Sequence, residues 1–302
     1  MPVEVRFGSR VVACSAVIFD KDGTLLDGYR LWEELAGLRT RILKEQLEEQ
    51  YQEQYQKQHQ RQCRRQYQVK DRAQEGGRGL EVGDIEGIEG AIAEIIASYR
   101  ATLGIGDDGA IDRRGPLVLA SCRDEVVMTA TTLYQHGFRW DDALIIAENA
   151  YSEAERSLSL EAISIPVEGA YDILRDLIAV GVATAVATTD THARAEATLR
   201  TAGLEDVINI IVGVDDVERG KPHPDAIFRV CKELGVSCRE AVYVGDTITD
   251  MRTGHNASVA CRVGVLTGAG TREALEPLAD VVLESVKDIS VCHHPGARLP
   301  HV

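Results

Sequence analysis

Short runs of apolar, mostly β-branched residues recur in two parts of the chain and predict strands that are buried on both faces. The first run lies near the N-terminus, and we expect it to form one strand over residues 11–19. Runs of this length are too short to cross a bilayer, and without polar alternation they are typical of parallel sheets covered by helices. Five further runs follow residue 166, at 182–188, 208–212, 241–245, 263–266 and 280–283.

Amphipathic stretches separate these later runs. In residues 167–181 and 224–235 the apolar side chains recur on one helical face. Pro224 and Gly235 stand at the expected start and end of the second stretch. Strands that alternate with helices predict an α/β fold with a Rossmann-like parallel sheet, and we assign residues 1–27 and 166–291 to this core domain.

The segment 28–165 has helical periodicity throughout and no strand-like run between its helices. Residues 89–100, 123–137 and 141–158 each predict an amphipathic helix. We therefore expect an α-helical domain inserted after the first strand, and a separate tail over residues 292–302.

A low-complexity, glutamine-rich tract occupies residues 44–68 and leads into a glycine-rich stretch, so that 44–83 form one arm and loop. As a strand, the tract would be polar on both faces, and nothing would fix its register. Leucine or tyrosine recurs at every fourth position in a background of good helix formers, which favours an extended helix. We expect a solvated arm; a coiled coil that binds a protein partner or a second copy of the chain is the alternative. The recurring residues are Leu43, Leu47, Tyr51 and Tyr55.

The net charge and the cysteine content limit which partners and which cellular compartment we expect. The 302 residues include 48 acidic and 33 basic side chains, a formal charge of −15. This balance argues against nucleic acid or an anionic membrane as the main partner, because both attract basic surfaces. Seven cysteines without a CxxC pair suit reduced thiols and a cytoplasmic location.

Two carboxylates follow the first predicted strand at the point where it ends. Asp20 and Asp22 are one residue apart, and Gly23 and Thr24 come directly after them. Ligands of a parallel sheet bind beyond the carboxyl ends of its strands. Two such close carboxylates repel each other unless a cation or a shared proton intervenes, and the turn that follows can cradle an oxyanion with its amides and hydroxyl.

Three further groups of polar residues end later strands or lie in the loop just beyond one. Together with the first group they offer acids, hydroxyls and a lysine at one edge of the predicted sheet. They are Thr188 and Thr189 after 182–187, Lys221 after 208–212, and Asp246 and Asp250 after 241–245.

In chain order, DKDGT, ATTD, GKPHP and GDTITD resemble the four motifs of the haloacid dehalogenase superfamily. The helical insertion between the first two motifs resembles the cap of phosphoglycolate phosphatases and β-phosphoglucomutases. The resemblance implies a phosphatase for a small phosphorylated metabolite, such as phosphoglycolate or a sugar phosphate.

The resemblance also implies a role for each motif acid. Asp20 would attack phosphorus and form an aspartyl phosphate. Asp22 would protonate the leaving oxygen and later deprotonate the attacking water. Mg²⁺ would be held by the carboxylates of Asp20 and Asp246 and by the main-chain carbonyl of Asp22.

The other motif residues would act on the phosphoryl group. Lys221 and the hydroxyl of Thr188 would stabilise its charge, with Thr189 donating beside them. Asp250 would hold Lys221 or a metal-bound water. Gly23 and Thr24 would line the phosphate.

Lys21 stands between the two aspartates, where the family more often has leucine. Because side chains alternate along an extended chain, we expect Lys21 to point away from Asp20 and Asp22. We assign it no catalytic role.

The family resemblance implies that the helical insertion decides which leaving group fits. Its arginines are candidate anion contacts, although we expect each of them to be solvated. They are Arg39, Arg41, Arg113, Arg114 and Arg123.

Four alternatives to a phosphatase can be weighed on the residues. Asp22 argues against a dehalogenase, which has no oxygen leaving group to protonate, and Asp22 directly before Gly23 argues against a phosphonatase. A phosphomutase of the β-phosphoglucomutase type keeps both aspartates, although Thr24 favours the phosphatases. The fourth alternative is a non-catalytic scaffold that uses the glutamine-rich arm, against which the complete set of motif residues argues.

Overall fold

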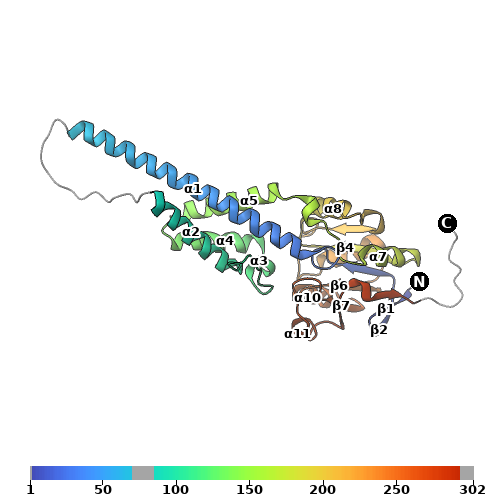
Figure 1. Cartoon of the computed structure of the whole chain (residues 1–302). Coiled ribbons are helices and arrows are strands. Elements are labelled where there is room, and N and C mark those ends of the chain that lie inside the picture. The colour runs from blue at the N-terminus through green and yellow to red at the C-terminus, as the bar shows by residue number, and fades with distance from the viewer. Residues whose placement is uncertain (1, 70–84, 293–302) are drawn as a thin grey trace. The chain divides into compact units, whose positions relative to one another are not determined.

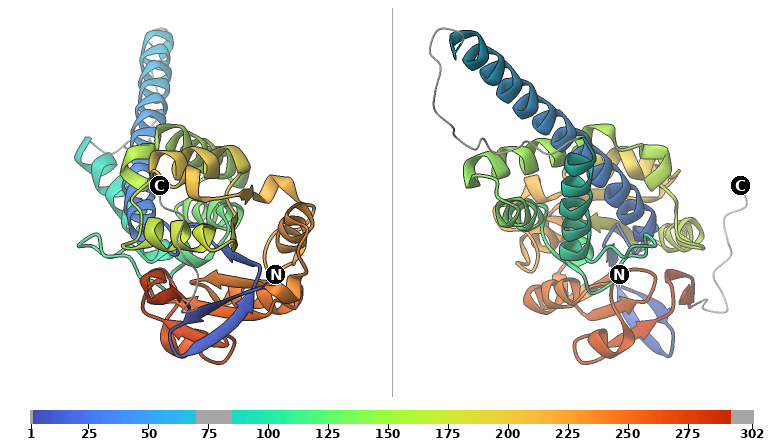
Figure 2. Two further views of the ribbon diagram at one scale, coloured as in Figure 1. Left: turned by 90° about the vertical axis from the view of Figure 1, so that its right-hand side faces the viewer. Right: turned by 60° about the vertical axis from the view of Figure 1, so that its left-hand side comes forward.

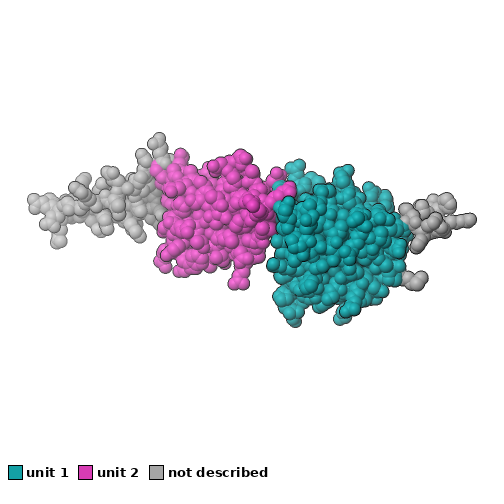
Figure 3. Space-filling model, turned by 90° about the horizontal axis from the view of Figure 1, so that it is seen from below, with its two compact units in different colours: residues 1–32, 159–302 teal, residues 33–158 magenta. Residues whose placement is uncertain are grey.

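The computed structural model describes residues 2–69 and 85–292, and the chain divides into two compact units. One unit comprises residues 1–32 and 159–302, and the other comprises residues 33–158 (Figure 3). The predicted glycine-rich stretch and all but the first residue of the predicted tail lie outside the described residues. In the described part of the chain, no helix is both long and apolar enough to cross a membrane.

The first unit is built on a six-stranded parallel sheet in the order β5-β4-β3-β6-β7-β8. β4, β6 and β7 of this sheet are labelled in Figure 1. β3 lies between β4 and β6, and all four of its residues are buried. The predicted α/β fold is therefore confirmed. The strands are β3 (Ala16–Phe19), β4 (Ala183–Ala187), β5 (Ile210–Val212), β6 (Ala241–Gly245), β7 (Cys261–Val265) and β8 (Val281–Leu283).

Alternating side chains of the sheet enter two separate cores. Val17 and Phe19 pack in one core with residues of α7 (Ala170–Ala179) and α8 (His192–Thr201). Ile18 and Tyr243 pack in the other core with residues of α9 (Asp225–Leu234) and α10 (Ile248–Ala257). Both faces of the sheet are thus covered, which explains why its strands read as continuous apolar runs. Two short helices, α6 (Leu160–Ile163) and α11 (Arg272–Leu275), complete this unit's α-helices in the described residues.

The first apolar run forms two strands, so the prediction of one strand over 11–19 is wrong. β1 (Val3–Phe7) and β2 (Arg10–Cys14) form an antiparallel hairpin, and β9 (Ile289–Val291) pairs with the other edge of β1. The hairpin is the blue N-terminal segment in Figure 2. The chain leaves this small sheet at Ser15, whose N–H donates to the carbonyl of Glu240 at 2.8 Å. The residues before and after Ser15 are apolar, so hydrophobicity alone does not indicate where the chain passes from one sheet to the other.

The second unit is helical. α1 (Gly28–Val69) runs without a break through the glutamine-rich tract, as the four-residue recurrence predicts. Leu43 and Leu47 are buried and Tyr51 is half-buried, whereas Tyr55 lies outside the described side chains. α4 packs against both α2 and α5. The remaining helices are α2 (Ile85–Leu103), α3 (Pro116–Leu119), α4 (Cys122–Gln135) and α5 (Trp140–Ser157).

Candidate active site

The motif residues lie at the carboxyl ends of neighbouring parallel strands or in the loop beyond one. Asp20 directly follows β3, Thr188 follows β4, and Asp246 follows β6. Lys221 lies in the loop that connects β5 to α9. Because these strands are parallel, the residues after them meet at one edge of the sheet, where ligands of such sheets bind.

Lys221 joins two of the motif acids. Its Nζ lies 2.5 Å from Oδ1 of Asp20 and 2.7 Å from Oδ1 of Asp250, and all three side chains are almost completely buried. Burial lowers the pKa of Lys221, but Asp20 and Asp250 outweigh this effect and raise it well above its ordinary value. Lys221 is therefore a fixed positive charge beside Asp20.

Asp250 is fixed by the start of α10 as well as by Lys221. Thr247 caps this helix, and the backbone N–H and hydroxyl of Thr247 donate to Oδ2 of Asp250 at 3.0 and 2.5 Å. The buried hydroxyl of Tyr243 donates to Oδ1 of Asp250 at 3.1 Å. Burial alone would raise the pKa of Asp250, yet Lys221 and Thr247 hold it below its ordinary value. Asp250 is thus an ionised anchor with both oxygens engaged.

Asp246 lies in a narrow space between two loops. Its Oδ2 accepts from the N–H of Ala269 at 2.7 Å, and the hydroxyl of Thr24 lies 3.5 Å from its Oδ1. A Cβ added to Gly268 would lie 2.4 Å from the Cγ of Asp246, so only glycine allows this approach. Burial, followed by the charges of Asp250 and Asp20, raises the pKa of Asp246 well above its ordinary value.

Carboxylate oxygens of Asp20, Asp246 and Asp250 lie within 4.8 Å of one another. Hard oxygen ligands of this kind suit Mg²⁺. Each oxygen of Asp250 already accepts two hydrogen bonds, whereas within the described residues no oxygen of Asp20 or Asp246 accepts more than one. Asp20 and Asp246 are therefore the acids better placed to bind a cation. Burial raises the pKa of Asp20 to about 7 although Lys221 lowers it, so the ionised forms of Asp20 and Asp246 need more positive charge than Lys221 supplies. The residues present therefore fit a divalent cation.

The loop after β3 makes the expected tight turn. The carbonyl of Lys21 accepts from the N–H groups of Thr24, Leu25 and Leu26. Gly23 has a positive φ of 82° and faces the Asp246 carboxylate. The hydroxyl of Thr267 donates to the carbonyl of Gly23 at 2.6 Å and ties the turn to the loop after β7. The turn thus lies directly beside the carboxylate cluster.

The two adjacent threonines of the second motif lie in different environments. Thr188 is buried, and its N–H donates to the carbonyl of Val212 at 3.0 Å. Its hydroxyl accepts from the N–H of Asp190 at 3.1 Å, which leaves the hydroxyl proton to donate elsewhere. Thr189 is exposed. Thr188 therefore has the fixed geometry that a phosphate contact needs.

Lys21 does not point away from the second aspartate, so that prediction is wrong. Its Nζ lies 2.8 Å from Oδ1 of Asp22 and 3.2 Å from Oδ2 of Asp190, and its side chain is buried. Alternation of side chains holds only for extended backbone, and the chain enters a turn after Phe19. Neither Lys21 nor its partner Asp190 was among the predicted site residues; the only sequence signal was a charged residue inside an otherwise buried motif.

The helical unit contains a buried ion pair where the sequence predicted a solvated arginine. Arg39 is 2% exposed and its guanidinium lies 2.7 Å from Glu125, above the ring of Tyr151. Burial raises the pKa of Glu125 to about 7, against the lowering effect of Arg39. The other four candidate arginines of this unit are exposed, as expected: Arg41, Arg113, Arg114 and Arg123.

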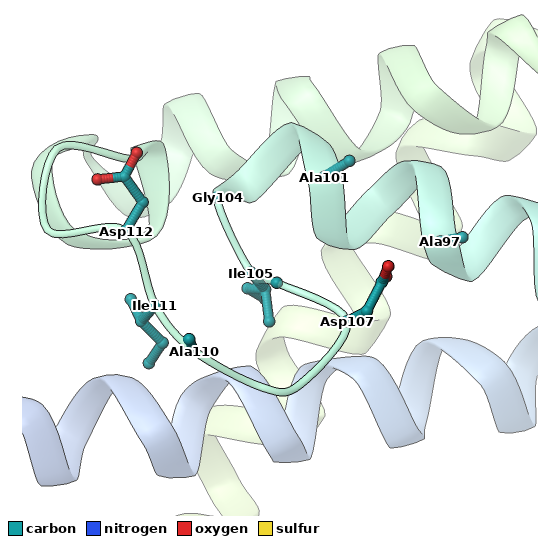
Figure 4. Close-up of a pocket in the computed structure, with 9 residues that line it drawn as sticks. Ala97, Ala101, Gly104, Ile105, Asp107, Ala110, Ile111 and Asp112 are labelled. Atoms are coloured by element: carbon teal, nitrogen blue, oxygen red, sulfur yellow. The ribbon is translucent and has the colours of Figure 1, made fainter.

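A hollow of about 530 Å³ lies at the C-terminal end of α2 (Figure 4). Small and apolar residues line most of it, including Ala97, Ala101 and Ile105, and its acidic members are Asp107 and Asp112. Its lining includes no lysine or arginine. This hollow is therefore unsuited to a phosphate group, unlike the edge of the sheet.

Comparison with known proteins agrees with the motifs. The family model for haloacid dehalogenase-like hydrolases matches residues 14–258. Pyrophosphatase PpaX of Halalkalibacterium halodurans is 32% identical over 124 residues, which are 41% of this chain and 58% of that protein. Validoxylamine A 7'-phosphate phosphatase of Streptomyces hygroscopicus subsp. limoneus is 30% identical over 139 residues, 46% of this chain and 60% of that protein. Each matched stretch thus spans less than two thirds of the relative's length.

Solved structures share this fold over residues that include both units. A crystal structure described as that of a predicted phosphoglycolate phosphatase from Haemophilus somnus 129pt covers 91% of this chain and 96% of its own, with a TM-score of 0.55. Its sequence identity is 16%, so the likeness concerns the fold alone. The family match covers most of the chain and includes all four motifs, and the chain belongs to the haloacid dehalogenase-like hydrolase family.

Proposed function

We propose that this protein is a Mg²⁺-dependent phosphatase that hydrolyses a small phosphate monoester through an aspartyl-phosphate intermediate. The observation that carries the proposal is the buried group of Asp20, Lys221 and Asp250 beside the Asp246 carboxylate. It combines a nucleophile, a fixed cation and a set of oxygen ligands at the ligand-binding edge of a parallel sheet.

In the first step, a carboxylate oxygen of Asp20 forms a bond to phosphorus while the bond from phosphorus to the ester oxygen breaks. The leaving oxygen takes a proton from the carboxyl group of Asp22 and departs as an alcohol. One difficult displacement is thereby divided into two easier ones.

In the second step, the oxygen of a water molecule attacks phosphorus while the carboxylate of Asp22 takes a proton from that water. The bond from phosphorus to Asp20 breaks, inorganic phosphate is released, and Asp22 is protonated again. The charge that develops on the phosphoryl group is stabilised by Lys221 and by the hydroxyl of Thr188, with Gly23 and Thr24 beside it. The role of exposed Thr189 rests on the family resemblance alone.

Mg²⁺, when bound by Asp20, Asp246 and the main-chain carbonyl of Asp22, would neutralise charge on the phosphoryl oxygens. The ligand role of that carbonyl rests on the family resemblance. Asp250 fixes Lys221 between itself and the nucleophile rather than offering a free oxygen to the ion.

The substrate class follows from the relatives' names and from the family resemblance. One relative is named a pyrophosphatase, and another is named a phosphatase of validoxylamine A 7'-phosphate. We assign this chain a small phosphate monoester, phosphoglycolate or a sugar phosphate, and assign the choice of leaving group to the helical unit. Release of free phosphate from these esters would support this assignment, whereas transfer to a second sugar hydroxyl would identify a phosphomutase.

The test compares Asp20→Asn and Asp22→Asn on aryl and alkyl phosphate monoesters. Asp20→Asn should abolish turnover of both, because it removes the nucleophile. Asp22→Asn should lower kcat on alkyl esters by about 10² or more, the usual contribution of a general acid, and lower it less on aryl esters, whose leaving groups need no proton. Equal losses on both ester classes would contradict the role of Asp22, and no turnover by the wild type on any ester would favour the scaffold alternative.

A further inference from the structure

A buried lysine connects the first motif to the second. Nζ of Lys21 lies 2.8 Å from Oδ1 of Asp22 and 3.2 Å from Oδ2 of Asp190, and only 1% of its side chain is exposed. Asp22 belongs to the turn after β3, and Asp190 lies two residues beyond Thr188. One ammonium group thus spans the two loops that we propose hold the general acid and the phosphate-binding threonine.

The carboxylate of Asp190 is itself fixed on several sides. Its Oδ1 accepts from the N–H of Thr191 at 3.0 Å, and its Oδ2 lies 3.4 Å from Nε of Arg194 on α8. Its backbone N–H donates to the hydroxyl of Thr188 at 3.1 Å. Asp190 is therefore a rigid anchor for Lys21, and it contacts Thr188 at the same time.

The side chain of Asp22 is 23% exposed, and its Oδ1 lies 2.8 Å from Nζ of Lys21. An ammonium group only donates hydrogen bonds. Because Oδ1 accepts from Lys21, Oδ2 is the oxygen of Asp22 that this contact leaves available. Lys21 thus determines which oxygen of Asp22 faces the reaction.

We propose that Lys21, anchored by Asp190, is a positioning residue that holds the Asp22 carboxyl group with Oδ2 free to exchange the proton. This inference rests on the proposed function, since it assumes that Asp22 is the general acid and base. A proton donor has to lie within hydrogen-bond reach of the leaving oxygen. A side chain with free rotation would leave that position for much of the time.

The alternative is an ion pair that only stabilises the fold. Burying an ammonium group is costly unless it is paired, and the two carboxylates meet that need whatever Asp22 does in catalysis. The two roles differ in one measurable respect. A structural pair changes stability without distinguishing leaving groups, whereas a positioning residue changes the steps that depend on Asp22.

The experiment measures kcat and KM of Lys21→Met on alkyl and aryl phosphate monoesters, with Lys21→Arg as the conservative variant. The expected result is a kcat on alkyl esters that falls by roughly tenfold to hundredfold, as for a catalytic group misplaced by about 1 Å. The loss on aryl esters should be smaller, KM should change little, and Lys21→Arg should recover part of the loss. Equal losses on both ester classes, or no loss, would overturn the proposal.

Arg262→Met is the matched control. Arg262 lies 3.0 Å from Asp280 in a partly buried ion pair of the same unit. It lies near the amino end of β7, at the edge of the sheet opposite the motif residues. This variant should lower stability without changing the ratio of alkyl to aryl turnover; a change in the ratio as large as that of Lys21→Met would also overturn the proposal.

Two further variants keep the test decisive if Lys21→Met does not fold. Asp190→Asn leaves Lys21 in place and loosens its anchor, so it should shift the same ratio in the same direction by a smaller factor. In an Asp22→Asn background, Asp190→Asn should have no further effect on the ratio, and an additive effect would overturn the proposal. If Asp22→Asn alone fails to distinguish the ester classes, the proposed function fails; if it does distinguish them and the Lys21 and Asp190 variants do not, only this inference fails.

Discussion

Substitution of Gly23 by alanine tests the geometry of the cluster more sharply than removal of a charged group. Gly23 has a φ of +82°, and an added Cβ would lie 2.7 Å from Oδ2 of Asp246 and 2.9 Å from the Cα of Gly268. Gly181 has nearly the same φ, +84°, and a Cβ there would have nothing within 4 Å. Gly181 precedes β4 at the opposite edge of the sheet. Gly23→Ala and Gly181→Ala thus introduce the same backbone strain, but only Gly23→Ala brings the added Cβ too close to Asp246 and Gly268.

The expected magnitudes follow from these distances. A non-glycine residue in the left-handed region costs about 1–2 kcal/mol, which is the whole effect expected at Gly181. Ordinary contact begins at 3.4 Å, so the Asp246 oxygen at 2.7 Å would have to move by about 0.7 Å. Overpacking of this kind adds about 1–3 kcal/mol, and we expect Gly23→Ala to lower the free energy of unfolding by about 2–5 kcal/mol in total.

The activity should separate the two variants further. Asp246 is a proposed metal ligand, and a displacement approaching 1 Å at a catalytic group can lower turnover by about 10². Gly23→Ala should therefore need more Mg²⁺ for half-maximal turnover and reach a lower kcat, while Gly181→Ala should match the wild type in both. Urea denaturation followed by circular dichroism and a Mg²⁺ titration of turnover measure the two effects. If the two variants are equal in stability and in Mg²⁺ requirement, the close approach of Gly23 to Asp246 is refuted.

Three other outcomes are expected. Mg²⁺ should support turnover and Ca²⁺, with longer and less regular coordination, should inhibit it; full activity in excess chelator would exclude the metal. Lys221→Met should lower the free energy of unfolding by about 3–5 kcal/mol, because it leaves Asp20 and Asp250 buried without their cation. Thermal unfolding measures this loss, and a variant as stable as the wild type would contradict the prediction. The pKa of Glu125 is about 7 in the folded chain, against an ordinary value of 4.5. Between pH 4.5 and pH 7 the folded chain therefore keeps a proton that the unfolded chain releases. The free energy of unfolding should fall by up to about 3 kcal/mol as the pH rises through this range. Glu125→Gln should flatten this part of a stability profile measured by urea denaturation, and an unchanged slope would exclude Glu125 as its cause.

The sequence was sufficient to predict what depends on local pattern and on the geometry of parallel sheets. The runs at 182–188 and 241–245 became β4 and β6 because strands covered on both faces are apolar throughout. The motif residues after them could be predicted to meet because parallel strands end at one edge.

What the sequence did not predict depends on partners that are distant along the chain. The break at Ser15 is set by the pairing of β1 with β2 and β9, and β9 begins more than 270 residues further along the chain. Arg39 was expected in solvent because its partner Glu125 is 86 positions further on. Lys21 was misplaced because the rule of alternating side chains was applied two residues past the end of β3 at Phe19.

The charges at the sheet edge indicate how binding and stability are connected in this fold. Three buried carboxylates, Asp20, Asp246 and Asp250, face one ammonium group, that of Lys221, which leaves an excess of two negative charges when all are ionised. Lys221 lies between Asp20 and Asp250, and Asp246 has only neutral donors among its hydrogen-bond partners in the described residues. A divalent cation bound between Asp20 and Asp246 would cancel this excess. A ligand that binds only the folded state stabilises it, so the same imbalance that prepares the site for a cation makes the folded unit less stable without one.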